Sequence, residues 1–186
     1  MGNVRVIEIK ESVFADNDAT SKAIREKMSA QRTLFLNVMS GPGSGKTTFL
    51  TTLINRLKDQ MKIGEMDVDI ETSLDAQRVA DLTGVESIQI HNCGLCHIDA
   101  DMVSRALLEY DTENLDLLIL ENIGNLVCPA EFDTGANLNL TILSVPEGDD
   151  KPAKYPLMYE VSDVLVINKI DALPVFDFRK DYVEAC

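Results

Sequence analysis

A glycine-rich segment that directly follows an apolar run constrains this chain more than any other feature. The apolar run covers residues 34–39, and Lys46 and Thr47 close the segment before a helical pattern begins. A strand, a glycine-rich turn, Lys-Thr and a helix together form the phosphate-binding loop of nucleotide-binding proteins. The usual pattern has a glycine where this chain has Ser40, but the remaining glycines still permit a turn whose N–H groups face an anion. The residues expected to bind the phosphates are Gly41, Gly43, Ser44, Gly45, Lys46, Thr47 and Thr48.

Length and charge narrow the possible classes of protein. A chain of 186 residues favours one domain with a sizeable core. A net charge of −14, from 17 basic and 31 acidic side chains, argues against sequence-independent nucleic-acid binding, which needs a basic face. No secretory pattern and no apolar run of about 18 residues is evident, so we expect a cytoplasmic protein without membrane contact. In that compartment, its four cysteines suggest metal or redox chemistry rather than disulfides.

Apolar strand candidates alternate with helical patterns along the chain. Strands are expected at 34–39, 66–70, 85–90, 115–120, 138–145 and 164–167, and helices at 48–60, 74–82 and 98–110. Several of these strands are continuously apolar, as strands buried on both faces are. The pattern predicts an α/β fold with a mostly parallel sheet and helices on both faces, the three-layer architecture of P-loop NTPases. We expect residues 1–33, an extended piece plus a helix, to be an appendage to a nucleotide-binding domain at 34–186.

Acidic residues at strand ends are candidates for holding magnesium. Glu121 ends an apolar strand, and in phosphate-loop enzymes an acid at such a position helps to bind Mg²⁺. Thr47 would give its hydroxyl to the same ion, while Lys46 would neutralise the β- and γ-phosphates. Asp75, with Asp69 as the next candidate, lies where a further Mg²⁺ contact is expected, although an acid there also suits the first turn of a helix. The expected catalytic group is Lys46, Thr47, Glu121 and Asp75.

A second nucleotide signal follows the strand candidate at 164–167. Asn168-Lys169-Ile170-Asp171 has the pattern of the guanine-reading turn of GTPases. The Asp171 carboxylate can accept hydrogen bonds from the ring N1–H and from the 2-amino group of guanine, a donor pair that adenine lacks. A site built for such groups can reject an analogue without them by roughly 10⁴-fold. Asn168, Lys169 and Asp171 therefore predict that GTP and GDP, rather than ATP, are the nucleotides.

Thiols and imidazoles form a second constellation. Cys96 and His97 are adjacent, and Cys128 lies on the segment that follows Glu121. Two thiolates and an imidazole suit Zn²⁺ or Ni²⁺, and Cys93 is a possible fourth ligand that would close the site. The alternative is that these are inert buried cysteines. Because Glu121 should respond to the γ-phosphate and Cys128 lies on the same segment, hydrolysis would reshape the metal site.

With these residues in view, the chain resembles the hydrogenase nickel-incorporation GTPases, the HypB family. The resemblance runs from about Leu34 to the end, and its most specific segments are 96–100, 121–130, 147–156 and 168–171. It implies GTP hydrolysis with Mg²⁺, a nucleotide-dependent homodimer, and delivery of nickel to the large subunit of nickel–iron hydrogenase alongside other maturation factors. The family's metal ligands correspond to Cys96, His97 and Cys128.

The sequence also departs from the family pattern. It has no N-terminal Cys-x-x-Cys-Gly-Cys motif and no histidine run, and Cys93 stands where the family usually has glycine. It ends at Cys186, where we expect the domain to lack its last strand and helix. Two other functions stay open. One is a urease-type nickel accessory GTPase, although those proteins carry Cys-Pro-His instead of adjacent Cys-His. The other is a zinc-binding scaffold without significant turnover.

Overall fold

A single parallel sheet forms the centre of the molecule. The computed structural model describes residues 4–8, 17–69, 74–92 and 94–186. The sheet has seven strands in the order β1-β4-β3-β5-β2-β6-β7, and every pairing is parallel. The strands are β1 (Val4–Glu8), β2 (Leu34–Ser40), β3 (Ile63–Asp69), β4 (Glu86–His91), β5 (Leu117–Gly124), β6 (Leu138–Ser144) and β7 (Val164–Asn168).

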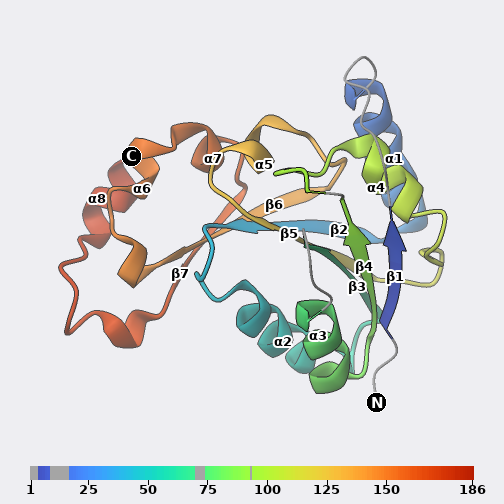
Figure 1. Ribbon diagram of the computed structural model, residues 1–186, viewed down its shortest axis with the longest axis horizontal. Coiled ribbons are helices and arrows are strands. Elements are labelled where there is room, and N and C mark those ends of the chain that lie inside the picture. Colours follow the sequence, from blue (N-terminus) through green and yellow to red (C-terminus); the bar gives the residue numbers. More distant parts are fainter. Residues whose placement is uncertain (1–3, 9–16, 70–73, 93) are drawn as a thin grey trace.

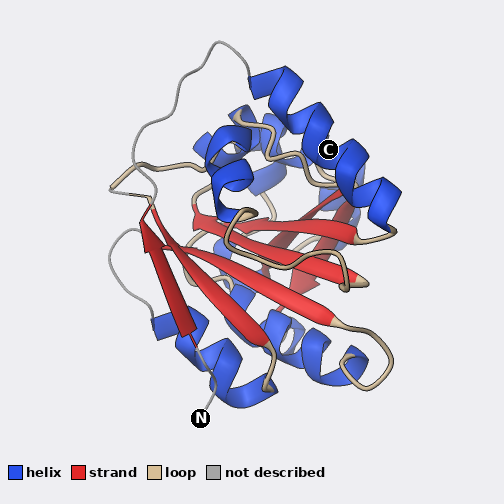
Figure 2. Ribbon diagram, turned by 90° about the vertical axis from the view of Figure 1, so that its right-hand side faces the viewer, coloured by secondary structure: helices blue, strands red, loops and turns tan. Residues whose placement is uncertain are grey.

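Helices cover both faces of this sheet (Figures 1 and 2). The lower face in Figure 1 carries α2 and α3, and the opposite face carries α1 and α4. The helices are α1 (Asn17–Gln31), α2 (Lys46–Leu57), α3 (Leu74–Thr83), α4 (Ala100–Ala106), α5 (Cys128–Glu131), α6 (Lys151–Lys154), α7 (Pro156–Glu160) and α8 (Lys180–Ala185). Short 3₁₀ turns occupy Val145–Glu147 and Ile170–Ala172. The expected fold class, α/β with a parallel sheet between helical layers, is confirmed.

The central strand β5 shows why its sequence is continuously apolar. Successive side chains of a strand point to opposite faces of the sheet. Leu118 and Leu120 join the buried cluster under α1 and α4, while Leu117 and Ile119 join the one under α2 and α3. Full burial of each such side chain contributes about 1.5–3 kcal/mol relative to exposure. A strand between two helical layers therefore needs apolar residues in both registers.

Strand β1 and helix α1, the described elements before residue 33, pack against the rest of the sheet. Strand β1 pairs with β4 at one edge of the sheet. Ile24 and Met28 of α1 are buried in the same core cluster as Met102 and Val103 of α4. Helix α1 therefore covers a part of the sheet that would otherwise face water, while the division into domains at residue 33 stays a prediction.

Several element boundaries differ from the expectation, those of β5 and α4 most. Strand β5 continues to Gly124 rather than ending at Leu120, because pairing with β2 reaches Gly124 opposite Ser40. Helix α4 covers only Ala100–Ala106 of the expected 98–110, and turns follow it.

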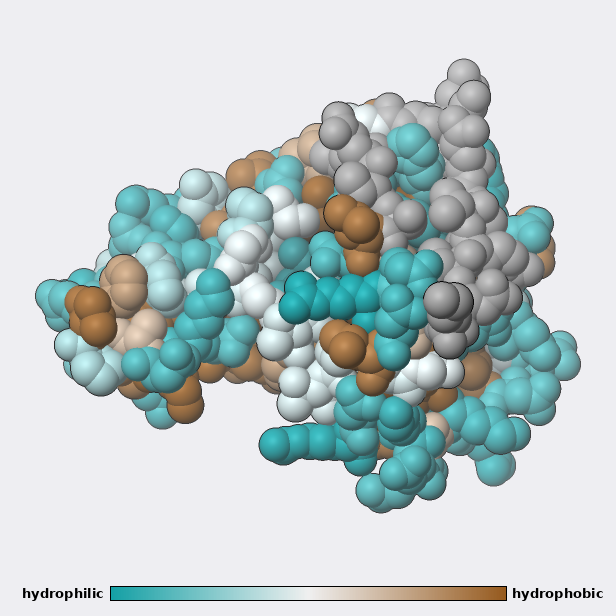
Figure 3. All heavy atoms as spheres, turned by 60° about the horizontal axis from the view of Figure 1, so that its bottom comes forward, coloured by the Kyte–Doolittle hydropathy of each residue, from teal (hydrophilic) through white to brown (hydrophobic). Residues whose placement is uncertain are grey.

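The surface over α2 and α3 is mostly hydrophilic, with hydrophobic residues in small groups (Figure 3). Within the described ranges, no helix combines the length and apolarity needed to cross a bilayer.

Candidate functional site

The glycine-rich loop joins β2 to α2 and shapes a cavity of about 230 Å³. Gly43 and Gly45 have φ angles of 72° and 95°, in the left-handed region that favours glycine. Lys46 is the first residue of α2, so the unpaired N–H groups of the first helical turn lie beside the loop, as an anion site requires. The residues lining the cavity are Gly43, Gly45, Lys46, Thr47, Thr48, Asp75, Arg78 and Glu121.

Two close approaches fix the position of this loop. A Cβ at Gly124, the last residue of β5, would lie 3.1 Å from the Cα of Pro42 and 3.4 Å from the Nζ of Lys46. A Cβ at Gly41 would collide with the carboxylate of Glu147, which itself accepts hydrogen bonds from the backbone N–H (2.8 Å) and hydroxyl (2.6 Å) of Ser144. The end of β5 therefore packs directly against the loop.

Three of the predicted magnesium residues, Thr47, Asp75 and Glu121, line this cavity. The Thr47 hydroxyl donates a hydrogen bond to Glu121 at 2.8 Å, and Asp75 lines the same cavity. Burial raises the pKa of Glu121 to about 7, although Lys46 and the Thr47 hydrogen bond act in the opposite direction. Asp69 ends β3 nearby, and its charge contributes to raising the pKa of Glu121.

Sequence reasoning missed two buried acids behind Glu121. Asp67 of β3 lies opposite Glu121 in the register, and ligand atoms of Glu65, Asp67 and Glu121 lie within 4.8 Å of one another. Burial, and next the charge of Glu121, raises the pKa of Asp67 to about 8. Burial, and next Asp67, raises the pKa of Glu65, which accepts a hydrogen bond from Ser87. The missed signal is the alternation of acids at 65, 67 and 69, which places all three on one face of a strand.

The donor set in this cavity fits a magnesium ion. Glu121 Oε2 and Asp67 Oδ2 are buried without a hydrogen-bond partner. Buried oxygens of this kind require a proton or a cation as partner. Mg²⁺ prefers oxygen ligands, and Thr47 supplies a hydroxyl beside the same carboxylate. The geometry is therefore compatible with the magnesium site expected at Thr47, Glu121 and Asp75.

The predicted guanine-reading turn lies against the glycine-rich loop. Asn168 donates a hydrogen bond to the carbonyl oxygen of Ser44 at 2.9 Å, and Lys169 donates to that of Gly43 at 2.6 Å. Asp171 is exposed in the 3₁₀ turn that follows β7. Asn168 and Lys169 thus hold the loop in place, and Asp171 lies on the same turn.

The predicted metal ligands also come together. The Sγ atoms of Cys96 and Cys128 are 2.8 Å apart, and Cys96 Sγ lies 3.9 Å from His97 Nδ1. The hydrogen bond between the thiols raises the pKa of Cys96, and burial lowers the pKa of His97, which favours the neutral imidazole that binds metals. Cys93 lies outside the described residues. Two thiols and an imidazole at this spacing form a donor set suited to Zn²⁺ or Ni²⁺.

One short segment connects the two centres. Gly124 packs against the glycine-rich loop, and the Leu126 Cδ1 atom would lie 3.6 Å from a Cβ at Gly41. The Asn125 side chain accepts a hydrogen bond from the N–H of Val127 at 2.8 Å, and Cys128 follows as the first residue of α5. A shift at the loop can therefore reach the thiol of Cys128 through a few residues of backbone.

Comparisons with known proteins show the family of this chain. A family model described as CobW/HypB/UreG, nucleotide-binding domain, matches residues 35–184. The hydrogenase maturation factor HypB of Rhizobium leguminosarum bv. viciae is 41% identical over 182 residues, covering 98% of this chain and 60% of that protein. The HypB of Helicobacter hepaticus, named a hydrogenase/urease maturation factor, is 41% identical over 180 residues. This match covers 95% of this chain and 73% of the Helicobacter hepaticus protein. The chain belongs to the HypB family.

A solved HypB structure supports the same assignment. The crystal structure of HypB from Helicobacter pylori in complex with nickel matches with a TM-score of 0.83 at 40% identity, covering 92% of this chain and 80% of that one. The family assignment establishes a nucleotide-binding P-loop domain. This chain spans about 60% of the length of the Rhizobium HypB.

Proposed function

We propose that this chain is a GTP-hydrolysing metallochaperone that carries nickel for hydrogenase maturation. The observation that carries the proposal is the segment Glu121–Cys128. It begins at a carboxylate bonded to Thr47 of the phosphate-binding loop and ends at a thiol 2.8 Å from Cys96. The names of the relatives, and the nickel in the Helicobacter pylori structure, support the choice of metal and of pathway.

The nucleotide half of the proposal assigns a role to each group. Lys46 and the loop amides bind the phosphates, and Asn168 and Asp171 recognise guanine. Mg²⁺, held by Thr47, Glu121 and Asp75 with Asp69 as a further candidate, would neutralise charge on the β- and γ-phosphates. Lys169 supports this arrangement by holding the loop at the carbonyl of Gly43.

In the metal-binding part of the proposal, nickel is cargo that the protein binds and delivers. Cys96, His97 and Cys128 supply three ligands, and a site with three protein ligands keeps a position open for exchange. Zn²⁺ accepts the same ligand types, so metal supply contributes to selection. When the γ-phosphate leaves, Gly124 loses a neighbour, and the segment leading to Cys128 would move and change the chelate. The partners in this proposal are a second copy of the chain in a nucleotide-dependent homodimer, other maturation factors and the hydrogenase large subunit.

Phosphate release and metal binding together test the proposal. We expect the protein to release phosphate from GTP with Mg²⁺ and not from ATP, and Lys46→Ala to abolish this activity. We also expect about one nickel ion per chain, lost in Cys96→Ala. Phosphate release no faster than in Lys46→Ala would contradict the GTPase and favour the zinc-binding scaffold.

A further inference from the structure

Helix α1 contacts both of the loops that carry the chelate. Cys96 and His97 precede α4, whereas Cys128 begins the segment that leads past α5 to β6. We propose that Asn17, Arg25 and Phe132 position the metal ligands by fixing these two loops against each other. This inference rests on the proposed metal site and concerns residues outside the ligand set. We call these three residues the clamp; Asn17 and Arg25 lie on α1, and Phe132 follows α5.

Asn17 bridges the two loops with one side chain. Its Oδ1 accepts a hydrogen bond from the backbone N–H of Ala100 at 2.8 Å, at the start of α4. Its Nδ2 donates to the carbonyl oxygen of Asp133 at 3.1 Å, on the loop that follows Cys128. An amide side chain offers a donor and an acceptor in a fixed geometry, so both bonds form only while the loops keep their relative position.

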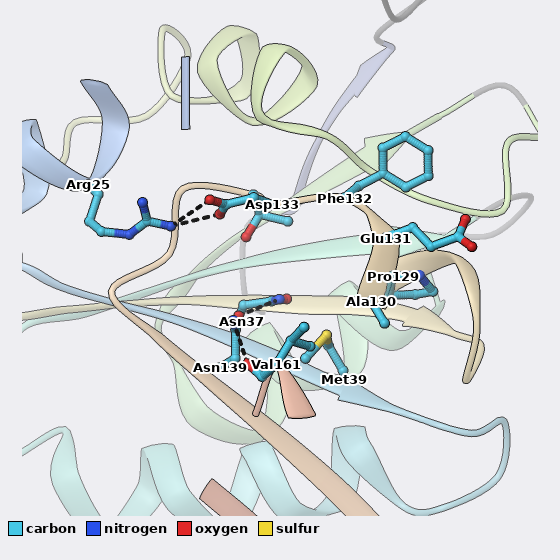
Figure 4. A pocket seen from close by; sticks show the side chains of 11 residues that line it. Arg25, Asn37, Met39, Pro129, Ala130, Glu131, Phe132, Asp133, Asn139 and Val161 are labelled. Atoms are coloured by element: carbon cyan, nitrogen blue, oxygen red, sulfur yellow. Dashed lines mark hydrogen bonds and ion pairs between the residues drawn. The ribbon is translucent and has the colours of Figure 1, made fainter. Parts of the chain in front are cut away.

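Arg25 ties the second loop to the same helix. Its guanidinium donates two hydrogen bonds to the Asp133 carboxylate, at 2.7 and 2.9 Å (Figure 4). A third hydrogen bond, at 2.9 Å, goes to the carbonyl oxygen of Ala136. Burial acts to raise the pKa of Asp133, but Arg25, the N–H of Gly135 and the Ser21 side chain together hold that pKa below its usual value. Nη2 bonds both carboxylate oxygens while Nε bonds the backbone of Ala136, so the guanidinium is held at two points of the loop by charge-assisted hydrogen bonds.

Close packing at Gly135 also connects the loop after α5 to helix α1. Gly135 has a φ angle of 81°, and a Cβ there would lie 2.7 Å from the Cβ of Ile24 and 2.9 Å from the carbonyl oxygen of Ser21. The loop therefore lies directly on α1, beside a cavity of about 280 Å³ lined by Arg25, Phe132 and Asp133 among others (Figure 4). Any movement of α1 is transmitted to the loop.

Phe132 completes the clamp at the ligand itself. Its ring stacks on that of His97 with centroids 3.7 Å apart and planes inclined by 8°. The stack fixes the plane of the imidazole and so the direction of Nδ1, which lies 3.9 Å from Cys96 Sγ. Because Phe132 lies four residues after Cys128, the stack also joins the two ligand-bearing loops.

Positioning of this kind has a measurable consequence. Groups that orient metal ligands without touching the metal typically change metal affinity by about 10–100-fold when removed. In a tetrahedral site with Zn–S bonds of about 2.3 Å, two thiolates lie about 3.8 Å apart, farther than the 2.8 Å between Cys96 and Cys128. The loops must open slightly to admit the ion, and the clamp keeps the imidazole aligned while they do so.

Nickel titration followed by thiolate-to-metal absorption tests the clamp. We expect Asn17→Ala and Phe132→Leu each to weaken nickel binding about 10-fold or more and to alter the absorption band, with GTP affinity unchanged. Phe132→Tyr, which can still stack, should bind nickel as the wild type does. Lys22→Ala, an exposed position on the same helix, is the matched control. Asn17→Asp keeps the acceptor for Ala100 and loses the donor to Asp133, so it is the second variant if Asn17→Ala fails to fold.

The outcomes separate the clamp from the function it serves. Nickel affinity in Asn17→Ala and Phe132→Leu within about twofold of the wild type would contradict the clamp and leave the proposed function standing. A wild-type protein that binds neither Ni²⁺ nor Zn²⁺ would contradict the proposed function and the clamp with it. A loss of GTP affinity that is measured without nickel and parallels the loss of nickel affinity would identify a general folding defect and contradict a positioning role.

Discussion

Asp67 and Glu121 carry raised pKa values because they are buried beside each other with few compensating positive charges. Asp67 titrates near pH 8 and Glu121 near pH 7, compared with about 4 in an unfolded chain. The folded protein therefore holds protons that the unfolded chain releases. Their contribution to stability is complete below about pH 4 and is lost as the pH rises through 7 to 8.

Because this stabilisation is lost as the pH rises, the protein without nucleotide and metal should become less stable at high pH. We expect the free energy of unfolding, measured by urea denaturation in a chelator, to fall by about 4 kcal/mol between pH 6 and 8.5. Asp67→Asn, which stays neutral, should show a smaller decline. A variant with the same pH dependence as the wild type would mean that Asp67 does not bind a proton in the folded state.

Asp171 provides a second residue-scale prediction, on base selection. Each hydrogen bond to a charged group contributes about 1.5–3 kcal/mol, so Asp171→Asn should lower GTP affinity by about 10-fold or more. The same variant should bind xanthosine triphosphate better than GTP, because the amide can donate to the oxygen that replaces the 2-amino group. Fluorescence titration with both nucleotides measures the change, and unchanged GTP affinity would remove Asp171 from this role.

Some residues of the candidate site could be predicted from the sequence, and others could not. Lys46, Thr47 and Asn168 lie in short patterns whose chemistry depends on neighbours in sequence. Asp67 depends on strand order instead, because it meets Glu121 only through the pairing of β3 with β5. Phe132 likewise reaches His97 through tertiary packing. Local patterns predicted the first group, whereas contacts between distant segments were beyond them.

At the scale of elements, the turn from β2 to α2 depends on Gly45. A Cβ there would combine a φ of 95° with a contact of 2.8 Å to the Nδ2 of Asn168. Gly84 is a matched control, with a φ of 76° and nothing within 4 Å. We expect Gly45→Ala and Gly84→Ala each to destabilise the protein by about 1–2 kcal/mol, and only Gly45→Ala to weaken GTP binding. Equal GTP affinities in the two variants would show that the contact between Asn168 and the loop is not needed.

Helix α1 was expected in an appendage, and the structure shows how closely it packs on the rest of the chain. Met28 of α1 is fully buried in the core. Met28→Ala should therefore lower the free energy of unfolding by about 2–5 kcal/mol in chemical denaturation. Lys27→Ala, on the exposed side of the same helix, should change it by less than about 0.5 kcal/mol. If Met28→Ala lowered the free energy of unfolding as little as Lys27→Ala does, α1 would be an appendage that contributes little to stability.

Across the whole molecule, the α/β class followed from the alternation of apolar strands and helical patterns, because a parallel sheet between helices needs both. The order of the strands did not follow, since β1 lies beside β4 at one edge and β2 lies between β5 and β6. This order sets Glu121 and Gly124 beside the phosphate-binding loop and directs the next residues toward Cys128. The proposed coupling is thus a property of the sheet as a whole.

Nickel affinity measured in the GTP-bound and GDP-bound states is the most direct test of this coupling. Because couplings between sites are reciprocal and typically change affinity about 5–150-fold, nickel should also shift the affinity for GTP relative to GDP by the same factor. A non-hydrolysable GTP analogue with Mg²⁺, compared with GDP under identical conditions, gives both quantities by titration. We expect at least a fivefold difference in nickel affinity between the two states. Equal nickel affinity in both would contradict the link between the phosphate-binding loop and the Cys96–His97–Cys128 site.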